Sequence, residues 1–174
     1  MKTTTRSCVV LAAFAAFAGG ACAHISLQQP RAEAGRPYEA VLRIGHGCDG
    51  APTTGVVVQI PKGFEGAKPL PKSGWKVAVQ GGAATWTAAS PEAALPSGQR
   101  GEFVLAGTAP TETGALWLKV LQTCQQGSRD WSQVPPEGTS TKAMKFPAVL
   151  LQVVSPGDFA APAGGAAPAD AHKH

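Results

Sequence analysis

The sequence has little of three features that would narrow its function quickly. After an apolar run from Val9 to Ala18, no stretch approaches the ~20 apolar residues that a membrane-spanning helix needs. No run of lysine and arginine predicts a nucleic-acid-binding surface, and no window shows a convincing amphipathic helix. These absences favour an exported or soluble protein without a transmembrane segment or a nucleic-acid partner, built mainly from strands.

The first 23 residues have the three parts of a secretory signal peptide. Lys2 and Arg6 precede the apolar run, and small residues follow it up to Ala23. Cleavage after Ala23 would make His24 the first residue and leave its α-amine free. The formal charge of +4 would then fall by two, because Lys2 and Arg6 leave, to +2. We therefore expect a periplasmic or secreted protein of nearly balanced charge.

Cys22 allows a different fate for the N-terminus. In a lipoprotein, cleavage would follow Ala21, and Cys22 would be acylated as the new terminus. Gly19 stands where the lipoprotein motif usually has a leucine. We therefore favour cleavage between Ala23 and His24 and keep lipidation of Cys22 as the alternative.

Two of the four cysteines lie in the leader, so Cys48 and Cys124 remain in the mature protein. Two cysteines in an exported chain usually form one disulfide, and two buried thiols are the alternative. In the chain-entropy model, closing so long a loop stabilises the fold by roughly 4 kcal/mol.

Short segments with alternating apolar residues, bounded by turn residues, recur after the leader. Gly81-Gly82 separates two of them and predicts a hairpin. Many such segments in about 150 residues predict an all-β protein, an antiparallel β-sandwich of the immunoglobulin or cupredoxin type. Trp75, Trp86 and Trp117 are expected to be packing residues. The predicted strands are residues 38–44, 53–60, 75–80, 84–87, 102–106, 115–124 and 148–154.

The composition changes to proline, alanine and glycine from residue 156 onward, which predicts a disordered tail over residues 156–174. His172 and His174 near its end are a weak metal-binding pattern on their own. The expected organisation is a signal peptide at 1–23, a domain at 24–155 and this tail.

A free N-terminal histidine offers two nitrogen donors from one residue, its α-amine and its ring Nδ1. Nitrogen donors in a tetragonal arrangement suit Cu(II), which also lies at the top of the divalent affinity order. The amine must lose its proton to bind, and Cu(II) competes for it near neutral pH. The pattern is suggestive only, because many exported proteins begin with histidine by accident.

Longer motifs point the same way. They are AHISL at 23–27, HGCDGAPTTGVVVQIP at 46–61, KPLPKSGWKV at 68–77, GEFVLAGTAP at 101–110, LQTCQQGSRDW at 121–131 and VPPEG at 134–138. In these motifs the chain resembles the YcnI-like family of exported bacterial copper-binding proteins. The resemblance extends over nearly the whole mature domain.

The resemblance implies a β-sandwich that binds one Cu(II) through a single-histidine brace. His24 matches the terminal histidine, Glu102 the glutamate ligand and Trp131 the tryptophan close to the metal. Glu39, which also lies on a strand near the N-terminus, is the alternative for the glutamate. His46, in His-Gly-Cys-Asp-Gly, is a further candidate for a second imidazole, although a loop histidine bonded to backbone is the more ordinary interpretation.

These observations predict a periplasmic Cu(II)-binding protein, not an enzyme, that buffers copper or transfers it. Its partners would be another periplasmic copper chaperone or a membrane copper transporter. One alternative is a copper-dependent oxidase resembling lytic polysaccharide monooxygenases, which would need a second histidine such as His46. The other is a metal-independent envelope module attached through Cys22.

Overall fold

The structure is a computed structural model that describes residues 24–160. The predicted signal peptide with Cys22, and residues 161–174 with His172 and His174, lie outside the described residues. Within the described part, the chain is nearly all strand, as the alternation predicts.

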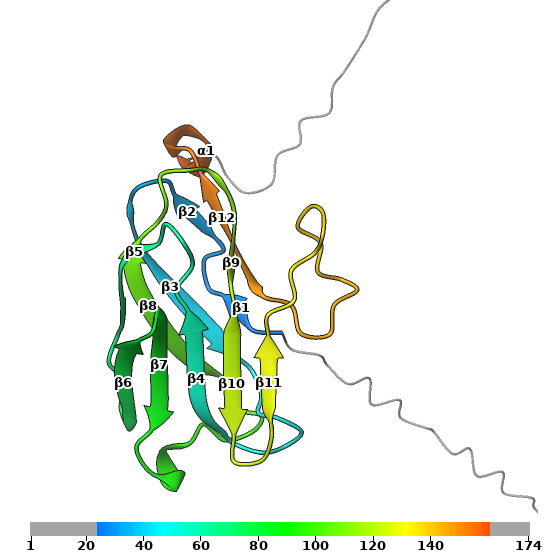
Figure 1. The fold of residues 1–174 in the computed structure, drawn as a ribbon. Coiled ribbons are helices and arrows are strands. Elements are labelled where there is room, and N and C mark those ends of the chain that lie inside the picture. Colours follow the sequence, from blue (N-terminus) through cyan, green and yellow to red (C-terminus); the bar gives the residue numbers. More distant parts are fainter. Residues whose placement is uncertain (1–23, 161–174) are drawn as a thin grey trace, which may run out of the picture.

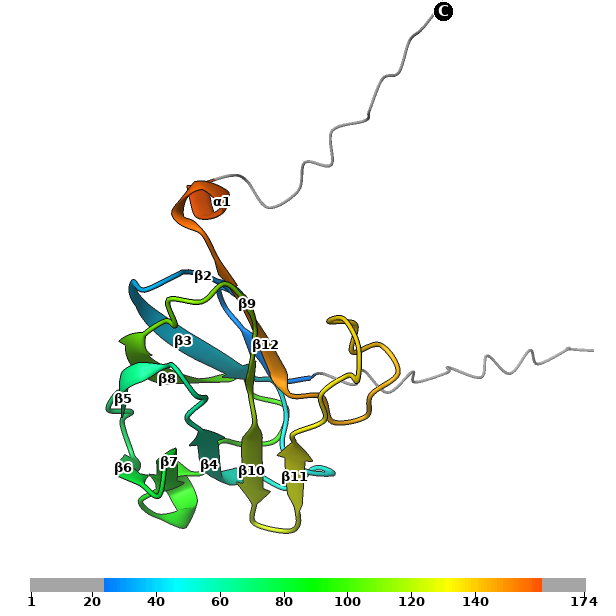
Figure 2. The same cartoon turned by 45° about the horizontal axis from the view of Figure 1, so that its top comes forward.

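The strands form three hydrogen-bonded sheets that enclose one core (Figures 1 and 2). The first has the order β1 (Ser26–Leu27), β3 (Pro37–Ile44), β8 (Gly101–Thr108) and β5 (Glu65–Pro69). The second has the order β11 (Ser128–Trp131), β10 (Val120–Cys124), β4 (Thr53–Gln59), β7 (Ala83–Ala88) and β6 (Trp75–Gln80). The third has the order β2 (Arg31–Glu33), β12 (Val149–Val154) and β9 (Gly114–Leu118).

The strand predicted over residues 38–44 is confirmed as β3, and its apolar face points inward. Tyr38, Ala40, Leu42 and Ile44 are buried, whereas the residues between them are more exposed. Successive side chains of a strand point to opposite faces, so one apolar set covers the core. Burying a side chain as large as Leu42 stabilises the fold by about 1.5–3 kcal/mol.

The hairpin predicted at Gly81-Gly82 is also confirmed, and it joins β6 to β7. Both glycines have positive φ, 58° and 75°. A two-residue hairpin turn of this kind requires that conformation at both positions, and glycine adopts it without steric cost.

The strand predicted over residues 115–124 is divided in the structure. Residues up to Leu118 pair with β12, and residues from Val120 pair with β4 and β11. The chain therefore passes from the third sheet into the second at Lys119, and Figure 1 shows β9 running directly into β10. The prediction missed β1, β2, β5 and β11, because strands of two to five residues show too little alternation.

The expectation of disorder from residue 156 was wrong for its first five residues. Pro156–Ala160 form a short helix, α1. The Ser155 hydroxyl hydrogen-bonds the Asp158 carboxylate and accepts from the Asp158 backbone N–H, which caps the turn. Arg31 donates to the Asp158 carbonyl and ties the turn to β2. Across residues 24–160, no helix is long and apolar enough to cross a membrane.

The disulfide between Cys48 and Cys124 is present, with the two Cα atoms 5.9 Å apart. It joins the loop after β3 to the end of β10. Both residues are buried, so the crosslink lies inside the end of the domain at which β3 finishes.

Candidate metal centre

His24 lies immediately before β1, at the start of the described chain, and is half-buried. Its ring meets the ring of Trp131, with centroids 6.0 Å apart and the planes at 69°. This is an edge-to-face arrangement, which aromatic rings prefer over a stacked sandwich. The structure thus brings together two of the residues that the sequence predicts for the metal site.

Trp131 is fixed in place from three sides. It ends β11 opposite Val120 of β10, at the edge of the second sheet, and is only 1% exposed. The ring of Phe146 meets it edge to face at 5.4 Å. Its indole N–H donates to the side-chain oxygen of Gln122 at 3.1 Å. Trp131 is therefore a core residue and, at the same time, a rigid wall beside His24.

Gln122 joins this wall to the loop that follows β3. The residue is fully buried on the inner face of β10, opposite Val56. Its amide N–H₂ donates to the His46 carbonyl and to the Thr53 hydroxyl, each at 2.8 Å. With the Trp131 contact, both polar atoms of its side chain are paired, as a buried amide requires. Sequence reasoning missed Gln122, although a glutamine at an inward position of VLQTC was the available indication.

The loop after β3 is held to the second sheet. His46 Nδ1 makes a hydrogen bond with the Gly47 carbonyl at 2.9 Å, which agrees with the ordinary interpretation of a loop histidine. Cys48 and Ala51 exchange two backbone hydrogen bonds and close a turn. A Cβ at Gly47 would lie 1.8 Å from the Ala51 carbonyl oxygen, so the two backbone segments are in direct contact.

An ion pair fixes the tip of the same loop. Asp49 has a φ of 48° and begins an Asp-Gly turn, and its carboxylate pairs with Arg129 of β11. The hydrogen bond from Arg129 and its positive charge lower the pKa of Asp49. The disulfide and this pair attach the loop to both strands that carry Gln122 and Trp131.

Glu102 has a different neighbour. Arg43 Nε lies 3.0 Å from its carboxylate oxygen, on the outer face of the first sheet. Ser26 pairs with Arg43, and Arg43 pairs with Glu102, so β3 separates Glu102 from β1. At about 4.8 Å between strands, the backbone of Glu102 is roughly 10 Å from β1. Binding a metal at His24 would require Glu102 to leave Arg43.

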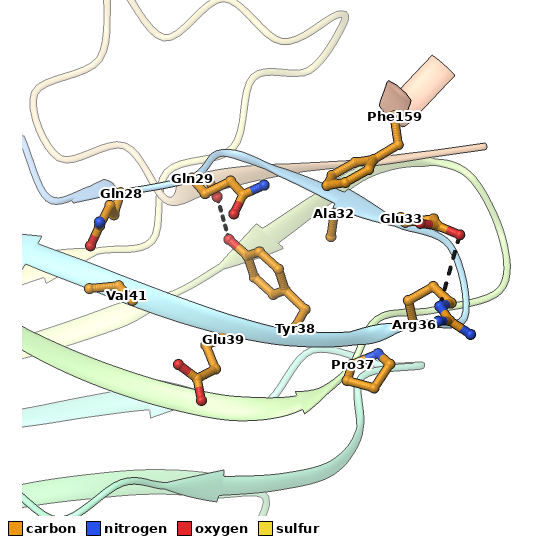
Figure 3. Close-up of a pocket in the computed structure, with 10 residues that line it drawn as sticks. All are labelled: Gln28, Gln29, Ala32, Glu33, Arg36, Pro37, Tyr38, Glu39, Val41 and Phe159. Carbon is orange, nitrogen blue, oxygen red and sulfur yellow. Dashed lines mark hydrogen bonds and ion pairs between the residues drawn. The ribbon is translucent and has the colours of Figure 1, made fainter. Parts of the chain in front are cut away.

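Glu39 lies near the opposite end of β3. Leu42 pairs with Leu27, and Glu39 is three residues further from the His24 end, roughly 10 Å along the strand. Figure 3 shows Glu39 next to Tyr38, in a groove that Phe159 of α1 also lines. The structure does not bring Glu39 together with His24.

Within residues 24–160, no group of three or more histidine, cysteine, aspartate or glutamate side chains could hold a metal ion. A terminal brace differs from such a cluster, because one of its donors is the main-chain amine. The ring nitrogens of His24 beside an aromatic wall fit the nitrogen donors that copper prefers. A groove of about 270 Å³, lined by His24, Thr139, Thr141 and other residues, opens beside it.

The sequence matches the family model described as a domain of unknown function, DUF1775, over residues 24–84 and 81–153. Together these segments contain every candidate residue of the site. The chain belongs to this family. DUF1775 is the domain of the YcnI-like proteins, so the resemblance in the motifs is confirmed at the level of the family.

A solved structure supports an immunoglobulin-like fold for this DUF1775 domain. An uncharacterized protein from Nocardia farcinica with an immunoglobulin-like fold is 23% identical, with a TM-score of 0.65, and the match covers 76% of this chain and 99% of that one. A non-cellulosomal cohesin from the archaeon Archaeoglobus fulgidus is 12% identical over 76% of this chain and 91% of that one, with a TM-score of 0.45. None of the curated proteins matches the chain. The Nocardia likeness bears on the fold alone.

Proposed function

We propose that this DUF1775 domain binds one Cu(II) ion at His24 after export and signal-peptide cleavage. The observation that carries the proposal is the contact between His24 and the fixed ring of Trp131. His24 is also the first residue of the family match. A terminal histidine placed against a rigid wall is a prepared ligand, because fewer ring orientations must be given up when the metal binds.

In this proposal, the freed α-amine and Nδ1 of His24 chelate the ion. Trp131 blocks one side of the imidazole, and its own indole N–H is already used by Gln122. By family resemblance, Glu102 is the oxygen ligand once it releases Arg43. Copper would be cargo, carried in the periplasm or outside the cell between a copper chaperone and a membrane copper transporter.

Binding and transfer suit the site better than catalysis. His24 is half-buried and borders an open groove, so another protein's ligands could approach the ion from that side. We therefore propose a copper-buffering or copper-transfer role and no enzymatic reaction.

The test compares protein that begins at His24 with protein that carries one additional alanine before it. The addition turns the amine into an amide and leaves every side chain unchanged. We expect Cu(II) affinity, measured by competition with a chromophoric chelator, to fall by more than about tenfold, since losing an outer-shell partner alone costs 10–100-fold. One alanine added after His174 is the matched control. Equal affinities for the two N-terminal forms would overturn the proposed site.

Mass spectrometry of the exported protein tests the maturation step. We expect a mature chain that begins at His24 with a free amine. A diacylated N-terminal Cys22 would exclude the amine ligand and favour the envelope lipoprotein.

A further inference from the structure

β6 is the last strand of the second sheet, and within residues 24–160 its outer side pairs with no other strand (Figure 1). The hydrogen bonds from β6 to β7 alternate along the strand. The Ala89 N–H donates to the Gly74 carbonyl, which marks these two residues as a hydrogen-bonded pair. In the same register the even-numbered residues of β6 bond β7. The backbone N–H and C=O groups of Val77 and Val79 therefore point away from the sheet.

This free stretch of edge is short and closed at both ends. At one end, the Trp75 N–H donates to the Lys72 carbonyl. At the other, the chain turns back at Gly81-Gly82 into β7. Between these points, the side chains of Val77 and Val79 are 38% and 51% exposed. An exposed strand edge with apolar side chains is a template for pairing with another strand.

The other edge strands of the two larger sheets have features that oppose such pairing. β1 has two residues, and β5 shifts its register after Glu65 and ends in Pro69. β11 has four residues, of which Arg129 and Asp130 are charged. Short strands, irregular register, proline and charge all protect natural sheet edges. β6 has six residues and a single charge, Lys76.

The outward groups of β6 are complementary to those of a second copy of the same strand. In an antiparallel pair centred on Ala78, Val77 lies opposite Val79 of the second copy, and Val79 lies opposite its Val77. Both are hydrogen-bonded pairs, so four backbone bonds form and every outward group of these two residues is used. Lys76 lies opposite the uncharged Gln80, so no like charges are directly opposed. The small side chain of Ala78 meets its own copy on the two-fold axis.

We propose that two copies of this domain associate through antiparallel pairing of their β6 strands. The two five-stranded sheets then form one continuous sheet. The inference does not depend on copper. β11, which carries Trp131, is at the opposite edge of the second sheet, so the two proposed copper sites lie at the far ends of the enlarged sheet. One short strand from each copy buries less than the roughly 1,200 Å² of a standard interface, so we expect a weak, concentration-dependent dimer.

Cysteine crosslinking tests this register in protein that begins at His24, whose native cysteines are joined in the disulfide between Cys48 and Cys124. Ala78→Cys places two thiols in a non-hydrogen-bonded pair with Cα atoms about 4.5 Å apart, within the reach of a disulfide. Lys76→Cys is the matched control on the same face of β6, because its two copies are offset by four residues, about 13 Å along the strand. We expect Ala78→Cys to form a disulfide-linked dimer at least about tenfold faster than the control under mild oxidation.

Sedimentation equilibrium measures the association itself. We expect the average mass to rise above that of the monomer between about 10 μM and 1 mM protein. Val79→Lys places the lysines of the two copies diagonally across the pair and should weaken the association at least about tenfold. Val134→Lys is the matched control, because Val134 is an exposed valine, 39% exposed, in the loop after β11. It should leave the association unchanged.

Each result either supports the pairing or overturns it. A monomer at every concentration up to about 1 mM would overturn it. Equal crosslinking of Ala78→Cys and Lys76→Cys, or equal weakening by Val79→Lys and Val134→Lys, would also do so, because the contact would then lie elsewhere. Preferred crosslinking at Ala78, with association lost in Val79→Lys whose thermal unfolding matches the parent, would establish the β6 dimer.

Discussion

The two ends of β3 differ in the size of the groove beside them and in the side chains that line it. The Pro37 end borders the larger groove, about 680 Å³, whereas the groove beside His24 measures about 270 Å³. At the larger one, the Tyr38 hydroxyl already donates to the Gln29 carbonyl and Glu33 lies near Arg36 (Figure 3). At the smaller one, the ring of the half-buried His24 lies beside the ring of the buried Trp131. The proposed copper site therefore lies beside the smaller of these two grooves.

The ends also differ in what holds them. The Ile44 end is crosslinked by the disulfide and by the buried Gln122 amide. The Pro37 end is held by an exposed ion pair and a helix of one turn. Changes at the first end should therefore affect stability and copper binding together, whereas changes to the exposed residues at the second end should affect neither strongly.

The largest effect is expected from removing the disulfide. Cys48→Ala with Cys124→Ala should lower the free energy of unfolding by about 4 kcal/mol, because the unfolded chain regains the entropy of a long loop. Urea unfolding followed by tryptophan fluorescence measures it. Arg36→Ala, which breaks only the exposed pair at the other end, should stay within about 0.5 kcal/mol. Similar losses in the two variants would contradict the comparison.

A smaller effect is expected from the buried amide. Gln122→Leu leaves the Trp131 N–H and the His46 carbonyl without their partner, which should cost about 1–3 kcal/mol. Because the indole then loses one of its three supports, quenching of tryptophan fluorescence by Cu(II) should change as well. Unchanged stability together with unchanged quenching would show that Gln122 does not position the site.

At the Pro37 end, we expect the stability contributed by Tyr38 to depend on alkaline pH. Burial raises the pKa of Tyr38 to about 12, above the value near 10 expected in the unfolded chain. The native state holds the proton more tightly, so the stability from this group is complete below pH ~10 and is lost as pH rises towards ~12. Tyr38 is the sole tyrosine, so tyrosinate absorbance reports it directly. Titration near pH 10 in the folded protein would contradict this burial.

The smallest effects are expected from the two candidate glutamates. Glu102→Gln should weaken Cu(II) binding by at most about 1 kcal/mol, or about fivefold, because the carboxylate must first leave Arg43. Glu39→Gln is the matched control and should not change the affinity, because it lies at the other end of β3. A larger loss of affinity in Glu39→Gln than in Glu102→Gln would place the metal at the Pro37 end of β3 and contradict the site at His24.

The sequence was sufficient where the determining pattern is local. The strand around Leu42, the Gly81-Gly82 turn and the pairing of Cys48 with Cys124 were all predicted correctly. Strands such as β1 and β11 were not predicted. A segment this short shows no recognisable alternation, and it becomes a strand only by pairing with a longer neighbour. The first turn of the tail was missed because the bond from Arg31 that ties it to the domain is not local.

By itself, the sequence determined the fold class, the disulfide and the residues available for a site. Side-chain periodicity is a local pattern, and the number of cysteines can be counted along the chain. Only the tertiary structure decided which of them meet. Trp131 lies against His24, Gln122 ties His46 to that wall, and Glu102 lies beside Arg43. These contacts depend on strand order and register, which are set by how the whole core packs and not by any one segment.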